Sequence, residues 1–336
     1  MDAVTSSRMI TGKLCASVTA APARGAAFAF TALVALLAAF PAQTLRAGEL
    51  APVRVAAGVY VLPGSGGEIT ADNDGRTANV AFVVGPRGVV VVNTGISFRE
   101  GEAIIAAVAR VSKRPIRLAI LTHPGQEAIF GAAAFQERGI PVLAARECAE
   151  LIAARCETCL SNLRRTLGEK AMAGTRVIVP DRMIENGQTL DLIGRKLRLI
   201  VPPWSSAPGA LAVFDETTAT LITGSLVSIA RIPDLRDARA QAWRSALVAL
   251  EATKCRHLIP GYGPAGTCAD VATFAQYFDA LDALVAELLR QGAGLADVRD
   301  RSDLPAFARW DQYDTLNGSN ANRTYLRLEQ EPLRSQ

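Results

Sequence analysis

Side chains that could perform chemistry follow the ends of several apolar segments of this chain. The stretch Leu121–Glu127 places the imidazole of His123 four residues before a carboxylate, and Ser225 and Tyr262 each follow a glycine after a further apolar run. Imidazoles and carboxylates are ligands for zinc and the usual partners in acid–base catalysis, whereas hydroxyl groups serve as nucleophiles or hydrogen-bond donors. Their repeated position after apolar runs predicts one shared site at the edge of a sheet.

The elements that must position these side chains are valine-rich strands and amphipathic helices. Gly, Pro and Asn bound the apolar segments, as is typical of buried strands, and apolar residues spaced three and four apart mark the helices. Two β-rich halves, each followed by helices, predict two sheets facing each other with helices outside, which is an α+β fold. The predicted strands cover 52–62, 79–84, 88–93, 116–121, 141–145, 188–201, 210–224 and 256–260, of which 210–224 is a hairpin with its turn near Asp215–Thr218. The predicted helices cover 98–112, 127–137, 146–169, 238–252 and 269–291.

The composition excludes some classes of partner. The 336 residues carry 36 basic and 32 acidic side chains, but residues 1–47 hold four of the basic ones and one acid. The remaining 32 basic and 31 acidic residues leave a body that is close to neutral. Such a body has no electrostatic reason to bind nucleic acid, and half of its residues are hydrophobic, which is enough for a large core.

The N-terminal segment has the pattern of a secretory signal. Residues 26–40 form an uncharged apolar run after a basic stretch, and the run is too short for a comfortable membrane span. We therefore expect residues 1–47 to be a signal peptide, cleaved between Ala42 and Ala47, with an uncleaved anchor as the alternative. The mature chain, 48–336, would be periplasmic and would contain no membrane span.

Five cysteines remain after the expected cleavage, so at least one would be free or paired between molecules. Cys255 and Cys268 flank a predicted strand and turn with twelve residues between them, and we expect a disulfide there. Cys156-Glu-Thr-Cys159 could carry thiol redox chemistry or half a zinc site, but its flanks predict a helix. A structural disulfide between Cys148 and one of this pair is favoured over both alternatives.

Taken in order, four of the loops resemble those of the metallo-β-lactamase superfamily. They are Asn93-Thr-Gly-Ile-Ser, Leu121-Thr-His-Pro-Gly-Gln-Glu, Thr223-Gly-Ser-Leu-Val and Ile259-Pro-Gly-Tyr-Gly-Pro. The chain looks most like the quinoprotein relay system zinc metallohydrolases, and this likeness covers nearly all of 52–331. It extends through Ala173-Gly-Thr, Pro180-Asp-Arg, Arg231-Ile-Pro with Trp243, and the tail Asn322-Arg-Thr-Tyr-Leu-Arg-Leu-Glu.

The resemblance implies a fold, a chemistry and a setting. The fold would be an αββα four-layer sandwich, formed by residues 48–336 as one domain with a helical C-terminal extension over about 292–336. Two zinc ions at one edge would activate water for attack on an ester, thioester or lactam. The setting would be the periplasm, alongside dehydrogenases that use pyrroloquinoline quinone (PQQ).

The sequence departs from this family at most of the metal-ligand positions. The family pattern His-x-His-x-Asp-His corresponds to His123-Pro-Gly125-Gln-Glu127-Ala128, which keeps one imidazole and exchanges one carboxylate. At the other positions the resemblance aligns Ser206 with a histidine, Ser225 with the bridging aspartate and Tyr262 with the last histidine. One imidazole and one carboxylate cannot complete a four-coordinate site, so zinc is an alternative and no bound cofactor is expected.

These substitutions predict a pseudoenzyme with no assigned catalytic residue. We expect it to bind a small molecule or a periplasmic protein in the former active cleft, lined at the seven positions above. The alternative is a metal-dependent hydrolase with a rebuilt site, in which Tyr262 would be a third ligand. A serine nucleophile at Ser206 or Ser225 with His123 as base is disfavoured, because the chain has no Gly-x-Ser-x-Gly elbow and no clear aspartate to orient the histidine.

Overall fold

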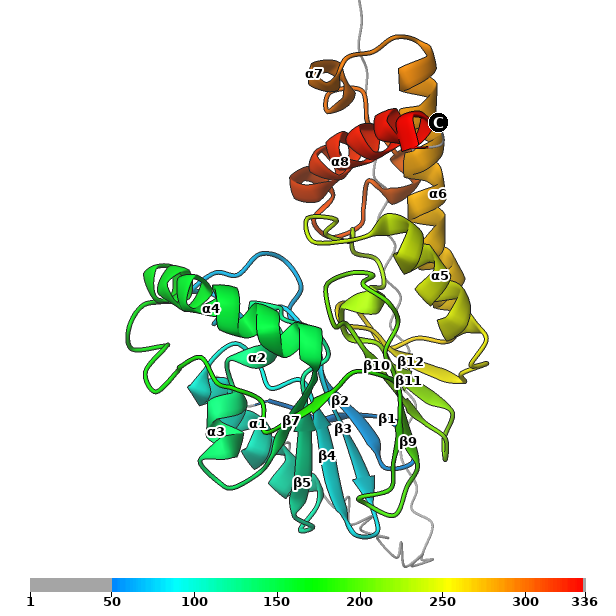
Figure 1. The fold of residues 1–336 in the computed structure, drawn as a ribbon. Helices are drawn as coiled ribbons and strands as arrows, with labels where there is room; N and C mark the ends of the chain where they lie inside the picture. The colour runs from blue at the N-terminus through cyan, green and yellow to red at the C-terminus, as the bar shows by residue number, and fades with distance from the viewer. Residues whose placement is uncertain (1–49, 335–336) are drawn as a thin grey trace, which may run out of the picture. The chain divides into compact units, whose positions relative to one another are not determined.

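The strands form two mixed sheets in the computed structural model, which describes residues 50–334 and the side chains of 50–330. The predicted signal segment, 1–47, lies outside the described residues. The first sheet has seven strands in chain order: β1 (Val53–Ala56), β2 (Val59–Leu62), β3 (Val80–Gly85), β4 (Gly88–Val92), β5 (Ile116–Ile120), β6 (Val142–Ala145) and β7 (Arg182–Ile184) (Figure 1). The second has the order β12 (His257–Ile259), β11 (Thr220–Ile222), β10 (Ala212–Asp215), β9 (Leu197–Ile200) and β8 (Thr189–Leu190).

Strand direction changes once in each sheet. Neighbours from β1 to β4 are antiparallel, whereas β4 to β7 run parallel and are joined through helices. In the second sheet β8 to β11 are antiparallel, and β12 joins β11 in parallel. Parallel neighbours place their carboxyl ends at the same edge of a sheet, which is where ligands bind in sheets of this kind.

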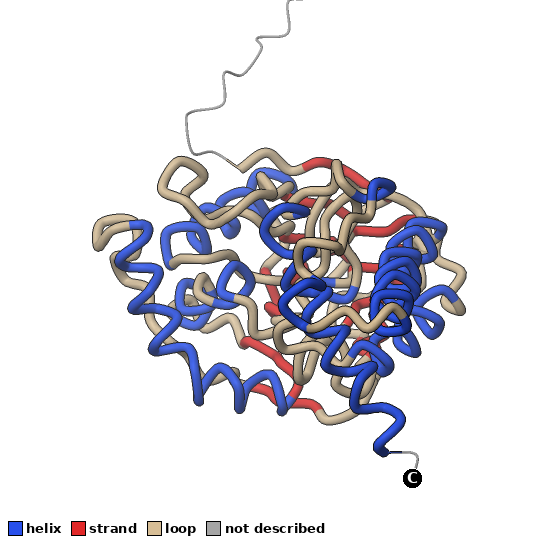
Figure 2. The backbone as a smooth tube through the Cα atoms, turned by 90° about the horizontal axis from the view of Figure 1, so that it is seen from above, coloured by secondary structure: helices blue, strands red, loops and turns tan. Residues whose placement is uncertain are grey.

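Helices cover the outer faces of both sheets, so that the strands lie between them (Figure 2). The first sheet is covered by α1 (Phe98–Val111), α2 (Gln126–Ile129), α3 (Ala132–Gln136) and α4 (Arg146–Leu167), and the second by α5 (Ala240–Glu251) and α6 (Ala269–Arg290). The rest of the chain adds the short helices η1 (Gly224–Leu226), α7 (Leu295–Val298) and η2 (Pro305–Phe307), and then α8 (Tyr313–Arg334).

Alternation along β10 shows how the sandwich is filled. Val213 lies in the apolar cluster that includes the first sheet, whereas its neighbours Ala212 and Phe214 lie in the cluster formed with α5 and α6. Successive side chains of a strand point to opposite faces, so the second sheet is buried on both sides. Leu221 and Ile222 of β11 divide between the two clusters in the same way. This confirms the predicted arrangement of facing sheets with helices outside.

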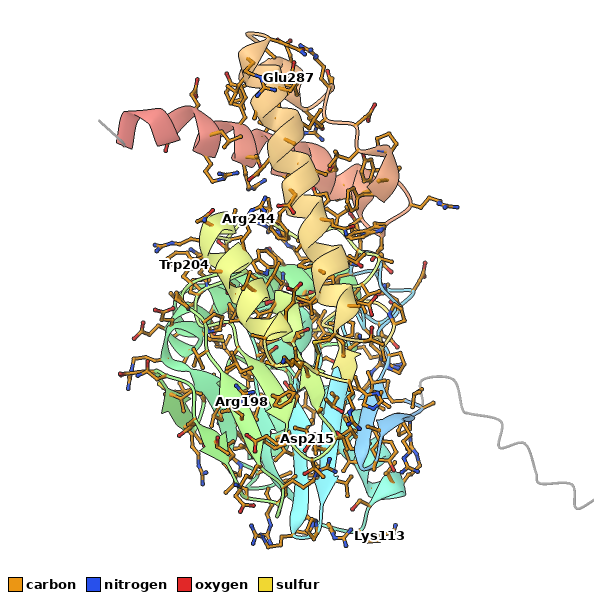
Figure 3. All side chains as sticks on the ribbon, turned by 90° about the vertical axis from the view of Figure 1, so that its right-hand side faces the viewer. Lys113, Arg198, Trp204, Asp215, Arg244 and Glu287 are labelled. Carbon is orange, nitrogen blue, oxygen red and sulfur yellow. A yellow bond between two sulfur atoms is a disulfide. The ribbon has the colours of Figure 1, made fainter. Side chains whose placement is uncertain are left out.

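A buried ion pair connects the two sheets. Arg195, just before β9, contacts both carboxylate oxygens of Asp215 at the end of β10, labelled in Figure 3, with Nε 3.0 Å from Oδ1. The same guanidinium donates to the carbonyl oxygens of Ala57 and Val84 in the first sheet, at 2.8 and 3.1 Å. Because its charge and donors are all matched, this arginine can be buried between the layers.

The C-terminal extension packs on α6 and shares a core with it. The ring of Tyr277 on α6 contacts Phe307 and Trp310, and its hydroxyl donates to Asn317 Oδ1 of α8 at 3.0 Å. Asp282 of α6 pairs with Arg327 of α8 at 2.5 Å and with Arg244 of α5, labelled in Figure 3, at 3.0 Å. Within residues 50–334, the helices are all too short or too polar to cross a membrane.

Four details differ from the sequence prediction. The predicted strand 188–201 is two antiparallel strands, β8 and β9. The predicted strand 52–62 is a hairpin, because Gly58 takes a positive φ of 73° between β1 and β2. The predicted helix 127–137 is two short helices, separated at Gly131, where a side chain would collide with the carbonyl of Thr94. Strand β7 was not predicted, since its three residues are too few to show a pattern.

The cysteines are only partly arranged as the sequence suggested. Cys255 and Cys268 form a disulfide with their Cα atoms 5.2 Å apart. The expected disulfide of Cys148 with Cys156 or Cys159 was wrong, because all three thiols are free. All three lie on the same helix, α4. Cys148 is eight residues before Cys156 and eleven before Cys159, so the helical rise alone separates its Cα atom from theirs by at least about 12 Å. A disulfide requires Cα atoms within about 7 Å.

Candidate functional site

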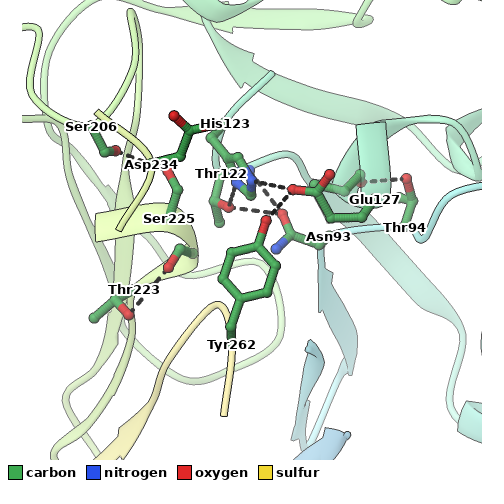
Figure 4. A network of polar contacts seen from close by, with 12 residues as sticks. Asn93, Thr94, Thr122, His123, Glu127, Ser206, Thr223, Ser225, Asp234 and Tyr262 are labelled. Atoms are coloured by element: carbon green, nitrogen blue, oxygen red, sulfur yellow. Dashed lines mark hydrogen bonds and ion pairs between the residues drawn. The ribbon is translucent and has the colours of Figure 1, made fainter. Parts of the chain in front are cut away.

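Loops from both sheets meet at one edge of the sandwich, as Figure 4 shows. The loop after β5 supplies His123, and α2, which follows it, supplies Glu127. Ser225 lies in η1, directly after β11, and Tyr262 follows β12. Gly224 lets β11 end here, because it has a φ of 51° and a side chain at this position would collide with Thr122.

A cavity of about 550 Å³ opens among these loops. Of the seven positions singled out in the sequence, six line it: His123, Gly125, Glu127, Ser206, Ser225 and Tyr262. The seventh, Ala128, is fully buried and lies outside the lining. Its carbonyl oxygen accepts hydrogen bonds from the backbone and hydroxyl of Thr94, at 2.8 and 2.9 Å, so it supports the loop after β4.

A buried hydrogen-bond chain fixes the imidazole of His123. Asn93, held at a positive φ of 66° after β4, accepts at Oδ1 from the backbone and hydroxyl of Thr122, at 3.0 and 2.9 Å. The hydroxyl of Thr122 lies 2.8 Å from Nδ1 of His123. The Nδ1 edge of the ring is therefore hydrogen-bonded inside the protein, and only 4% of His123 is exposed.

The carboxylate of Glu127 contacts both His123 and Tyr262. Its Oε1 lies 3.2 Å from Nε2 of His123 and accepts a hydrogen bond from the hydroxyl of Tyr262. Burial alone would raise the pKa of Glu127, but the contacts with His123 and Tyr262 outweigh it and lower this pKa to about 2. An ionised carboxylate can only accept, so Nε2 of His123 carries a proton and donates. Neither ring nitrogen is left open toward the cavity.

The pKa of the Tyr262 phenol is raised well above its ordinary value, through burial and the adjacent negative charge of Glu127. The phenol is therefore neutral and serves as a donor. Its ring lies under the guanidinium of Arg231, 4.4 Å from the ring centroid. Arg231 in turn is paired with Asp311 of the C-terminal extension and donates to the carbonyl oxygen of Gly67 at 3.0 Å. The extension thereby helps to hold the Tyr262 loop.

The absence of a side chain at Gly125 is required by the His123–Glu127 contact. A Cβ atom at this position would lie 2.3 Å from Oε1 of Glu127 and 2.5 Å from Nε2 of His123. Its φ and ψ, −66° and 137°, are available to every residue, so the constraint is space rather than backbone conformation. The contact between His123 and Glu127 occupies the volume that a side chain would need.

The two serines form a separate pair on another wall of the cavity. The hydroxyl oxygens of Ser206 and Ser225 lie 2.9 Å apart. Both nitrogens of His123 are already engaged with Thr122 and Glu127. A serine nucleophile needs a free base within hydrogen-bond reach, and His123 cannot supply one in this arrangement.

The donors at this edge do not fit a zinc centre. Across the described residues, His, Cys, Asp and Glu side chains form no cluster of three or more that could hold a metal ion. His123 donates its Nε2 proton to Glu127, and Gly125 and Ala128 offer no ligand atom. A structural zinc needs four convergent donors and a catalytic zinc three, so these side chains fall short of both.

Sequence reasoning missed several residues of this site. Asn93 and Thr122 are polar residues directly after strands, and that position was the available signal. Asp311 gave no local signal, because its partner Gly67 lies 244 residues away in the chain. Cys156 and Cys159 also line the cavity, although the sequence gave no reason to place α4 against it.

Comparison with known proteins agrees with this fold. Residues 73–262 match the family model described as the metallo-beta-lactamase superfamily, and the chain belongs to that family. A metallo-beta-lactamase from Pontibacter korlensis superposes with a TM-score of 0.57 at 18% identity, over 69% of this chain and 99% of its own. The DIM-1 metallo-beta-lactamase, from a crystal exposed to ceftazidime, gives 0.55 at 16% identity, over 69% and 97%. A search of curated proteins gave no significant match.

Proposed function

We propose that this chain is a non-catalytic member of the superfamily that binds a small molecule in the former active cleft. The observation that carries the proposal is the contact of Glu127 with both His123 and Tyr262. In the family these positions hold metal ligands, whereas here their polar atoms bind one another. The site is stable without a metal, because every charge in it has a partner.

The remaining cavity supports binding rather than hydrolysis. A volume of about 550 Å³ lies within the usual range for small-molecule sites. Its wall combines apolar side chains such as Leu151 and Ile232 with the hydroxyl pair of Ser206 and Ser225. Such a lining offers burial for an apolar body and hydrogen bonds that fix its orientation.

The proposal includes a setting that comes from the family resemblance. We place the mature protein in the periplasm, exported by its N-terminal signal peptide and associated with PQQ-dependent quinoproteins. PQQ is the natural first probe for the cleft. Arg155, Arg231 and Arg236 line the cavity. Each is paired with an aspartate, so a carboxylate-bearing ligand of this kind would share these guanidinium groups with Asp237, Asp311 and Asp234.

The central test is the metal content and turnover of the purified chain. After dialysis without chelator, elemental analysis should find far less than one zinc per chain. With or without added zinc, the protein should not accelerate the hydrolysis of a lactam, a lactone or a thioester probe above the background rate. His123→Ala should change neither result, since this residue supports the structure but holds no metal.

One outcome would overturn the proposal. Stoichiometric zinc that survives dialysis and is lost in His123→Ala would establish a hydrolase with a rebuilt metal site. Binding is tested separately by titrating PQQ and following tryptophan fluorescence, because Trp243 lines the cavity. A matched variant, Ser206→Ala with Ser225→Ala, should weaken this binding, and an absence of quenching in the wild type would exclude PQQ as the ligand.

A further inference from the structure

Two free thiols on α4 line the same cavity and have no part in the function proposed above. Cys156 and Cys159 both belong to its lining, and neither is in a disulfide. They lie three residues apart on a helix, so their side chains are neighbours on one face. The neighbouring thiol of Cys159 also contributes to the raised pKa of Cys156. This arrangement differs from scattered core cysteines, which have no shared opening to a cavity.

The helix holds the pair too far apart for an easy disulfide. Side chains three apart on a helix have Cβ atoms about 5–6 Å from each other. A disulfide requires Cβ atoms at about 3.5–4.5 Å, so oxidation would distort the middle of α4. Two metal–sulfur bonds of about 2.3 Å each span a wider gap between the sulfurs. The spacing therefore suits an ion between the two sulfurs better than a direct bond.

The electrostatic surroundings of the pair disfavour thiol–disulfide exchange more than they disfavour metal binding. Burial and the neighbouring thiol raise the pKa of Cys156 to about 12, so the thiolate needed for exchange with an external disulfide is scarce. The carboxylate of Glu157 also raises this pKa, and the guanidinium of Arg155 opposes it only in part. A metal that bonds strongly to sulfur can displace both protons despite the raised pKa, because its binding energy offsets the deprotonation.

We propose that Cys156 and Cys159 form a two-coordinate site for a soft monovalent cation, of which Cu(I) is the test case. Binding would convert two thiols and one Cu(I) into a bis-thiolate complex of charge −1 with release of two protons, and no oxidant or reductant takes part. Soft thiolate ligands select Cu(I) over hard cations, and a two-coordinate ion needs no third side chain. The guanidinium of Arg155, which is paired with Asp237 at 3.0 Å, lies on the adjacent residue and would offset part of the net charge of the complex.

This site does not depend on the proposed function of the cleft. Its ligands are on α4, whereas the former metal positions lie on the segments after β5, β9, β11 and β12. Copper binding could fail while PQQ still binds, or the reverse, so the two proposals have distinguishable outcomes. A dithiol site at the wall would make the cavity responsive to copper without any change at His123 or Glu127.

The test is an anaerobic competition for Cu(I) against the coloured bicinchoninate complex, using the full chain with its Cys255–Cys268 disulfide intact. The wild type should withdraw one equivalent of Cu(I). Cys156→Ser and Cys159→Ser should each abolish the withdrawal. Cys148→Ser is the matched control, because this thiol is buried on the same helix but lies outside the cavity lining, and it should behave as the wild type.

A second measurement needs no variant and so does not depend on the folding of the serine proteins. Alkylation with iodoacetamide in mild denaturant, followed by peptide mass mapping, should show Cys156 and Cys159 protected by Cu(I) and Cys148 unprotected. Failure to withdraw copper, withdrawal that persists in both serine variants, or equal protection of all three thiols would each overturn the site. Recovery of the pair as an oxidised disulfide in the purified chain would also count against it.

Discussion

The hydroxyl of Tyr262 donates to Oε1 of Glu127, a carboxylate that lies 135 residues earlier in the chain. This bond ties the loop after β12 in the second sheet to α2 beside the first sheet. In a metal-containing relative the ions would join these loops, whereas here a charge-assisted hydrogen bond does so. The consequence is that the stability of the cleft depends on a few identifiable atoms.

Removing that hydroxyl should destabilise the protein. Tyr262→Phe keeps the ring under Arg231 but deletes the donor to an ionised buried acceptor, and a loss of about 1–3 kcal/mol is expected. Urea unfolding at pH 7 measures it. Tyr60→Phe is the matched control, because its ring stacks on Phe82 at 5.0 Å and that contact is preserved. Equal effects of the two substitutions would show that the Glu127 contact contributes nothing.

Glu127 should make the protein sensitive to acid. Its pKa is lowered to about 2 in the folded state from an ordinary value of 4.5, so the stabilisation is complete above pH 4.5. It is lost as the pH falls toward 2, and a shift of this size corresponds to about 3 kcal/mol. Glu127→Gln removes this component, so the stability difference between wild type and variant should shrink over that range. A difference that stays constant from pH 5 to pH 2.5 would contradict the assignment.

Glu100 should have the opposite dependence on pH. It is buried at the start of α1, where its carboxylate accepts from the backbone of Ile96 at 2.8 Å, and burial raises its pKa from 4.5 to about 7. The folded state then retains a proton that the unfolded state releases, so stability falls between pH 4.5 and 7, by up to about 3 kcal/mol.

Glu100→Gln should remove that fall, since the amide oxygen can still accept from Ile96 and carries no charge. At pH 8 the variant should therefore be more stable than the wild type, whereas at pH 4 the two should be similar. Denaturant unfolding at both pH values measures this difference in the free energy of unfolding. Glu127→Gln provides an internal comparison of opposite sign, and parallel behaviour of the two variants would refute the opposing pKa shifts.

Gly125 should not tolerate even a methyl group. An added Cβ atom would meet Oε1 of Glu127 and Nε2 of His123 well inside van der Waals contact, so the pair must separate. Gly125→Ala is expected to cost about 1–3 kcal/mol, through the lost contact of a buried charge. Gly294→Ala is the control, because its φ is −83° and the nearest atom would be 3.7 Å away. A neutral Gly125→Ala would show that the pair moves freely.

The sequence predicted most of the fold because its cores follow simple periodicities. Alternation along β10 and the three-and-four spacing on α6 each specify which face is buried, and both elements lie where they were predicted. The hairpin at Gly58 was missed because a positive φ leaves no mark in an apolar pattern except the glycine itself. The Cys148 pairing failed because cysteine identity carries no information on distance.

The site was less predictable because its bonds join distant segments. The resemblance indicated His123, Glu127 and Tyr262 as replacements for ligands, but it could not show that they bind one another. Ala128 is a buried support rather than part of the cavity wall, since the helix turns its side chain into the core. The bond between Arg231 and Asp311 crosses 80 residues and depends on how the C-terminal extension packs.

The disulfide between Cys255 and Cys268 should brace the loop that carries Tyr262. Its two ends lie just before β12 and directly before α6, and they close a loop that contains Tyr262, with a sequence separation of 13 between the cysteines. Cross-linking a loop of this length is worth about 3 kcal/mol by restricting the unfolded chain. Replacing both cysteines by alanine should therefore lower the free energy of unfolding by about that amount, measured in urea without reductant. Cys148→Ala, which deletes a buried thiol that is not cross-linked, controls for the loss of packing.

In the variant that lacks both cysteines, Tyr262→Phe should lower the free energy of unfolding by less than it does in the wild type, because the loop is already loosened. Recovery of Cys255 and Cys268 as alkylated thiols from the non-reduced wild type would remove the basis of this expectation.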